Sequence, residues 1–192
     1  MSTTATGSPT ATGPRILVAG IGNIFCSDDG FGSAVAQQLA AEVLPEGVEV
    51  ADIGIRGVHL AYQLLDGYDV LVLIDAYPRG EAPGTVTLLE PRVPAVDRAA
   101  VGAVPVDAHG MEPVAVLGLL ERLGAQSGNA VGRVLLVGCE PADVADGIGL
   151  SAAVSAAVPV AAARVHDLVG DLVARSDPAG ARGEQEVRTC PD

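Results

Sequence analysis

Residues 15–32 read RILVAGIGNIFCSDDGFG, and this stretch decides the fold. The apolar run 15–19 ends at Gly20 and predicts a buried parallel strand. Apolar residues then recur at helical spacing after the two acids, and Pro45 and Gly47 are expected to end that helix. The helix-spaced residues are Phe31, Ala34, Val35, Leu39 and Val43. The stretch therefore predicts a strand, a glycine turn that carries two acids, and a helix.

Strands and helices alternate along the rest of the chain. Further strands are predicted at 48–53, 69–75 and 133–138, with a more exposed edge strand at 85–89. Helices are predicted at 60–65, at 111–123 and from residue 150 onward. Such alternation favours right-handed crossovers that cover both faces of a sheet. We predict an α/β fold, a single three-layer α/β/α domain whose twisted, mostly parallel sheet has about five strands and one antiparallel edge strand.

The length of 192 residues is that of one ordinary domain. Both ends have small, polar or charged residues without periodicity. We predict disordered tails at 1–14 and 175–192 and a folded domain at 15–174.

Composition narrows the class of protein. The formal net charge of -13 disfavours nucleic acid and membrane surfaces as partners, although acidity also keeps an apolar chain in solution. Three widely spaced cysteines suit neither a disulfide framework nor a four-thiolate zinc site. The N-terminus lacks the pattern of a signal peptide, and Pro159 and Arg164 interrupt the apolar stretch after residue 150. We expect a cytoplasmic protein with a packed C-terminal helix.

The turn between Gly20 and Gly22 could be taken for a dinucleotide-binding loop. Phe25 stands where that motif needs a third small residue, and Asp28 and Asp29 would repel a pyrophosphate at the helix start. Nucleotide binding is therefore disfavoured for this chain.

Acidic residues follow three predicted parallel strands. Asp28 and Asp29 follow the first, Asp52 the second and Asp75 the third. Ligands of open α/β sheets bind at this carboxyl edge. An Asp at a helix start can simply cap the helix, but two in succession cannot cap it in the same way. We predict that Asp28 caps the helix and that Asp29 points over the edge of the sheet.

Asp75 and His109 extend this acidic edge. Asp75 ends an apolar strand, where a buried carboxylate needs backbone hydrogen bonds, an ion pair or a metal. His109 lies just before the predicted helix at 111–123. With Asp29 they would form an open site for a divalent transition metal such as nickel or zinc. A plain turn Asp and an incidental His are the alternatives that spacing leaves open.

These motifs resemble the hydrogenase maturation endopeptidase family. The resemblance covers about residues 15–172. It runs through the acidic turn and His109, and through the segments 52–57, 72–76, 83–86, 137–138 and 149–151. It implies a monomeric cytoplasmic protease that removes a C-terminal extension from the large-subunit precursor of a nickel-iron hydrogenase after nickel insertion. The alternative is a chaperone that binds metal or precursor without cleaving it, and nucleotide binding is the weakest of the three functions considered for this chain.

The resemblance also implies roles for single residues. The metal-contacting positions of the family fall on Asp29, where the family often has Glu, and on Asp75 and His109. The metal is nickel supplied by the precursor, or another divalent metal such as zinc in the isolated protein. The catalytic candidates are Asp29 and Asp75, with Asp52 a further candidate for activating water.

The loop after the second strand departs from the common form of the family. It contains Ile53 where Gly is usual and Arg56 where a small residue is frequent. We predict that Gly54, Arg56 and Gly57 of this loop contact the substrate and set which precursor is accepted.

Overall fold

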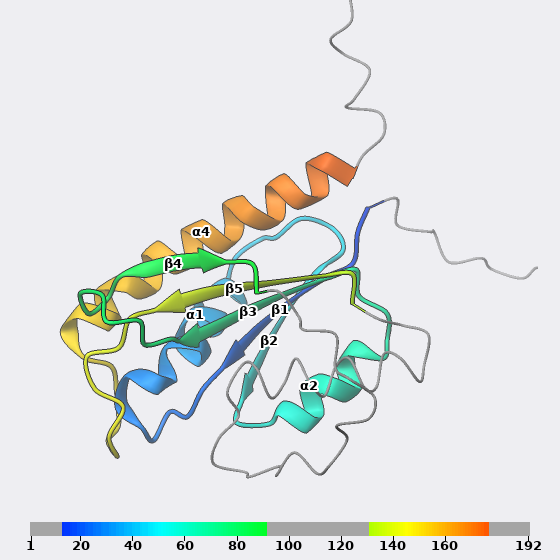
Figure 1. Cartoon of the computed structure of the whole chain (residues 1–192). Coiled ribbons are helices and arrows are strands. Elements are labelled where there is room, and N and C mark those ends of the chain that lie inside the picture. The colour runs from blue at the N-terminus through cyan, green and yellow to red at the C-terminus, as the bar shows by residue number, and fades with distance from the viewer. Residues whose placement is uncertain (1–12, 92–130, 177–192) are drawn as a thin grey trace, which may run out of the picture.

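The apolar runs of the sequence form one five-stranded sheet in the computed structural model, which describes residues 13–91 and 131–176 (Figure 1). The strands are β1 (Ile16–Ile21), β2 (Val48–Gly54), β3 (Val70–Ala76), β4 (Val86–Leu89) and β5 (Arg133–Cys139). The described helices are the 3-10 helix η1 (Ser27–Gly30), α1 (Phe31–Leu39), α2 (Gly57–Leu64) and α4 (Ala152–Ser176).

The strand order β2-β1-β3-β5-β4 places the junction between β1 and β3 at the centre of the four parallel strands. β2, β1, β3 and β5 are parallel, and β4 pairs with β5 antiparallel. The predicted antiparallel edge strand is thus confirmed. The chain leaves β1 toward β2 on one side, while β3 and β5 lie on the other. This reversal is a topological switch point, where the loops after the strands diverge and leave room for a ligand.

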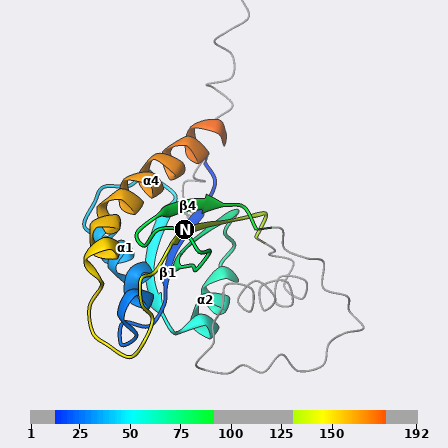
Figure 2. The same ribbon diagram turned by 60° about the vertical axis from the view of Figure 1, so that its left-hand side comes forward.

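Alternation along β1 divides the core into two layers. Ile16 and Val18 face α1 and α4, whereas Leu17 and Ala19 face α2. Figure 2 shows α1 and α4 on one side of the strands and α2 on the other. The three-layer α/β/α architecture is therefore confirmed.

The C-terminal helix α4 packs as a core helix. By length and composition alone it could cross a membrane. Its buried residues, including Val154, Val165 and Val169, belong to the same apolar cluster as α1, while Asp167 and Asp171 are exposed. This agrees with the predicted packed helix. The helix reaches Ser176, two residues beyond the predicted end of the domain at 174.

The predicted extent of the first helix was wrong. α1 ends at Leu39, and the side chain of Val43 is 92% exposed. The amides of Ala41 and Glu42 bond to carbonyls three residues back, so the chain tightens before Val43 and rotates it away from the core. The predicted helix at 111–123, His109, residues 1–12 of the N-terminal tail and residues 177–192 of the C-terminal tail lie outside the described residues.

Gly32 allows α1 to lie directly on the sheet. A Cβ atom on Gly32 would lie 2.2 Å from the carbonyl oxygens of both Ile21 and Ile74. We expect Gly32→Ala to lower the free energy of unfolding by about 2–3 kcal/mol, because backbone must move. Gly170→Ala is the matched control, since a Cβ there meets no atom within 4 Å, and it should stabilise the protein by about 0.5–1 kcal/mol. Urea unfolding followed by circular dichroism measures both, and equal effects would contradict this packing.

Candidate functional site

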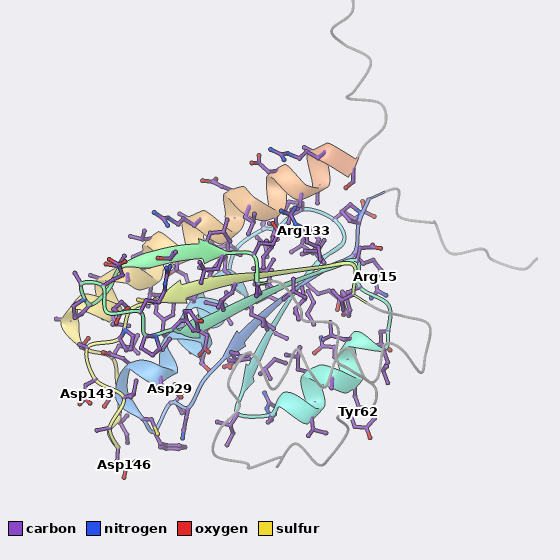
Figure 3. All side chains as sticks on the ribbon, in the orientation of Figure 1. Arg15, Asp29, Tyr62, Arg133, Asp143 and Asp146 are labelled. Carbon is purple, nitrogen blue, oxygen red and sulfur yellow. The ribbon has the colours of Figure 1, made fainter. Side chains whose placement is uncertain are left out.

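Three segments meet at the carboxyl end of the parallel strands, here called the rim. They are the acidic turn (residues 22–30), the end of β3, and the β5–α4 loop (residues 140–151). Figure 3 shows Asp29, Asp143 and Asp146 at this end of the sheet, with Arg15 and Arg133 toward the opposite end. The acids of the acidic turn and of the β5–α4 loop therefore lie at the rim (Figure 3).

Asp75 is a buried acid at the centre of the rim. It lies in β3, in register with Gly138 of β5, and its residue surface is only 6% exposed. Burial, and then the neighbouring charge of Asp29, raises the pKa of Asp75 to about 8, against the opposing effect of a hydrogen bond from the Ala76 amide. The Asp75 side chain is thus held mainly as the neutral acid at pH 7.

Asp29 lies on the acidic turn and is a neighbour of Asp75 in β3. Its Oδ2 accepts a hydrogen bond of 2.6 Å from the Asn23 amide, and its other carboxylate oxygen has no hydrogen-bond partner among the described residues. Gly22 has a φ of 124°, and a Cβ there would lie 1.9 Å from the Asp29 carbonyl oxygen. Glycine therefore lets the turn close around Asp29 and hold it at the switch point.

Asp28 has a different role from the one predicted. α1 has Gly30 at its N-cap without any side-chain cap bond, so the prediction that Asp28 caps this helix was wrong. The Asp28 carboxylate is fully buried and accepts bonds from the amides of Ala142 (2.8 Å), Asp143 (3.1 Å) and Ser151 (2.6 Å) and from the Ser151 hydroxyl (2.9 Å). Asp28 thus ties the acidic turn to the β5–α4 loop.

Burial alone would raise the pKa of Asp28, but these four hydrogen bonds together hold the pKa below its usual value. Ser151 immediately precedes α4, so the Asp28 charge also lies at the positive end of that helix. The partners of Asp28 are 114 to 123 residues away along the chain, which is why local helix-capping rules missed them.

Asp52 binds α1 through its side chain. Its carboxylate accepts bonds from the Ser33 hydroxyl (2.7 Å) and the Gln37 amide nitrogen (3.0 Å). Both carboxylate oxygens are therefore in use within the fold. A role for Asp52 in activating water stays a prediction, and it would require one of these bonds to open.

The loop after β2 is shaped by Gly54 and Arg56. Gly54 has a φ of 55°, and its carbonyl accepts a bond from the Gly22 amide at 3.2 Å, which links this loop to the acidic turn. The exposed Arg56 donates from Nε to the Ile53 carbonyl at 3.0 Å, and Gly57 begins α2. The loop is thus ordered by its own bonds, and contact of Gly54, Arg56 and Gly57 with a substrate remains a prediction.

The described donors match part of a metal site. Within residues 13–91 and 131–176, no three His, Cys, Asp or Glu side chains gather in a group that could hold a metal ion. Asp29 is close enough to Asp75 for its charge to raise the Asp75 pKa, and the third predicted donor, His109, lies outside these ranges. Two carboxylates suit a divalent cation that brings or receives further ligands from elsewhere.

Comparisons with known proteins agree on one family. The profile of the family described as hydrogenase maturation protease matches residues 33–168, a stretch that begins after Asp29. The chain is 36% identical to the hydrogenase expression/formation protein HupD of Rhizobium leguminosarum bv. viciae, over 77% of this chain and 70% of that protein. It spans 60 to 62% of the length of three further curated relatives of this kind.

Alignments with relatives from Escherichia coli cover a larger share of the relative's own length. The chain is 31% identical to the hydrogenase 2 maturation protease of strain K12, over 79% of this chain and 88% of that protein. The solved structure of the E. coli hydrogenase maturating endopeptidase HybD superimposes with a TM-score of 0.64 and 28% identity, covering 82% of this chain and 93% of that one. The predicted fold and the resemblance drawn from the acidic turn are thus both supported.

Proposed function

We propose that this chain, which belongs to the hydrogenase maturation protease family, is a peptidase that removes a C-terminal extension from the large-subunit precursor of a nickel-iron hydrogenase after nickel insertion. The relatives are named as hydrogenase maturation proteases and endopeptidases, and their names supply the reaction class. The partner is the precursor, and we expect the protease to act on it as a monomer in the cytoplasm.

The observation that carries the proposal is the Asp29 and Asp75 pair at the switch point. Asp75 is buried and neutral near pH 7, and the neighbouring Asp29 has one carboxylate oxygen without a hydrogen-bond partner in residues 13–91 and 131–176. A divalent cation binds the ionised form of a carboxyl, so a cation at this pair would displace the proton from Asp75. The pair is therefore suited to detect whether the precursor carries nickel.

In this proposal the nickel belongs to the substrate. Asp29 and Asp75, with His109 as third donor, contact it and so position the scissile peptide bond beside the rim. Zinc or another divalent metal would use the same donors in the isolated protein. Either polarisation of the scissile carbonyl or activation of a water by a carboxylate would then promote hydrolysis, with Asp52 as the further candidate for the second route.

Mass measurement of the precursor tests this function. Wild-type protein should shorten the nickel-loaded precursor and leave the nickel-free precursor intact. Asp29→Asn should slow cleavage by about 100-fold or more, because a neutral amide is a poor metal ligand and a poor base. Asp167→Asn on the exposed side of α4 is the control and should cleave like wild type. Binding of the precursor by wild-type protein without any shortening would identify the chaperone alternative instead.

A further inference from the structure

Four large apolar side chains are exposed on the two loops that Asp28 ties together. Ile24 (51% exposed) and Phe25 (63%) lie on the acidic turn, and Val144 (53%) and Ile148 (87%) lie on the β5–α4 loop. We call these four residues the apolar patch. Single exposed apolar residues are normal on protein surfaces, but a group on adjoining loops marks an interaction site.

The backbone holds the two halves of the patch in register. Cys26 and Gly147 form a parallel β-bridge, in which the Ser27 amide donates to the Gly147 carbonyl at 3.0 Å and the Gly147 amide donates to the Phe25 carbonyl at 2.9 Å. The Asp28 amide adds a bond of 3.0 Å to the Asp143 carbonyl. The apolar side chains therefore project from a backbone that these hydrogen bonds hold in place, which reduces the conformational entropy lost when a partner binds.

The two loops that carry the patch have charged residues of one sign only. Asp143 and Asp146 are exposed on the β5–α4 loop, and Asp29 lies on the neighbouring turn (Figure 3). Neither the acidic turn nor the β5–α4 loop contains a Lys, Arg or His residue. A partner with positive charge would be attracted to this surface, whereas a second copy of this chain, with a net charge of -13, would bring like charges together.

We propose that the apolar patch, with Asp143 and Asp146 at its border, is the docking surface for a basic segment of the precursor that also carries apolar side chains. This inference rests on the proposed function. It assigns recognition of the protein part of the substrate to the patch and recognition of the metal to Asp29 and Asp75. Ile24 and Phe25 of the patch lie on the same turn as Asp29, so a segment bound there is held next to the acid pair.

The apolar contribution is tested with the double variant Phe25→Ser/Ile148→Ser. The matched control is Val43→Ser/Val160→Ser, which removes two exposed apolar side chains (92% and 49% exposed) from the segment after α1 and from α4. With the nickel-loaded precursor as substrate, the patch variant should raise KM and the dissociation constant about 10-fold or more. Its kcat at saturating precursor should stay within about 2-fold of wild type, as should both constants of the control. An unchanged KM in the patch variant would overturn the proposal.

The charge contribution is tested with Asp143→Asn/Asp146→Asn. The amide oxygen at position 143 can still accept the bond that the Ala145 amide now donates at 2.9 Å, so the loop should keep its shape. We expect association with the precursor to slow several-fold at low ionic strength and to match wild type near 0.5 M salt, where screening is strong. Asp167→Asn/Asp171→Asn removes the same charge from α4 and should change nothing. Equal slowing by both pairs would show a general charge effect and exclude docking at the border residues.

The two proposals fail in different ways. If wild-type protein never shortens any nickel-loaded precursor, the proposed function is wrong. If wild-type protein shortens it and the patch variant does so with the same KM, only the docking surface is wrong. If light scattering finds a dimer that dissociates in the patch variant, the occupant is a second copy of the chain and the docking proposal is overturned.

Discussion

Asp75→Asn should make the protein more stable at alkaline pH and unable to process its precursor. The pKa of Asp75 is about 8 in the folded protein, against 3.8 for an ordinary Asp. A raised folded-state pKa means that the contribution of Asp75 to stability is fully present below pH 3.8 and is lost as the pH rises through 8. An amide of the same shape does not ionise, so the variant avoids that loss.

The gain in free energy of unfolding from Asp75→Asn should be absent near pH 4 and reach the order of a few kcal/mol above pH 8. Urea unfolding at pH 4, 7 and 9 measures it, with Asp167→Asn as the exposed control that should show no such trend. Cleavage of the nickel-loaded precursor should fall about 100-fold or more, because the variant cannot supply a carboxylate. A gain that does not depend on pH would contradict ionisation of a buried acid as the cause.

Asp28→Ala should cause the largest loss of stability among these variants. The substitution leaves the amides of Ala142, Asp143 and Ser151 and the Ser151 hydroxyl without their buried acceptor. Each lost partner of this kind costs about 1–3 kcal/mol, and the total should be roughly 3–5 kcal/mol because water can reach part of the opened loop. Hydrogen exchange should show lost protection at these three amides first.

Ser151→Ala is the graded control, since it removes one hydroxyl, which donates to Asp28 at 2.9 Å and accepts a bond from the Val154 amide at 3.4 Å. It should cost about 1–2 kcal/mol. The pH dependence provides a second check. The pKa of Asp28 is lowered in the folded protein, so its stabilisation is present above pH 3.8 and is lost as the pH falls through that lower value. The deficit of Asp28→Ala should therefore shrink in acid, opposite to the trend for Asp75. Equal deficits for Asp28→Ala and Ser151→Ala would contradict the role of Asp28 in joining the loops.

Asp28 and Asp29 show how two adjacent acids come to differ. Asp28 is buried, and its carboxylate accepts hydrogen bonds from backbone amides. Asp29 has one carboxylate oxygen without a hydrogen-bond partner in the described structure. A local rule could say that two successive acids cannot cap one helix in the same way. It could not say that Asp28 bonds to a loop more than 100 residues away.

The sequence by itself determined the strands, the helix that follows the acidic turn, the antiparallel edge strand and the edge of the sheet at which the acids gather. Apolar periodicity carries this information, because it reports which face of each element is buried. Only the tertiary structure decided where α1 ends, what Asp28 and Asp52 bind, and how far the pKa of Asp75 rises. Each of these depends on a neighbour from a distant segment, and local pattern does not record that neighbour. The sequence shows that residues 22–30 carry two acids, but the hydrogen bonds between this turn and the β5–α4 loop form only in the folded chain.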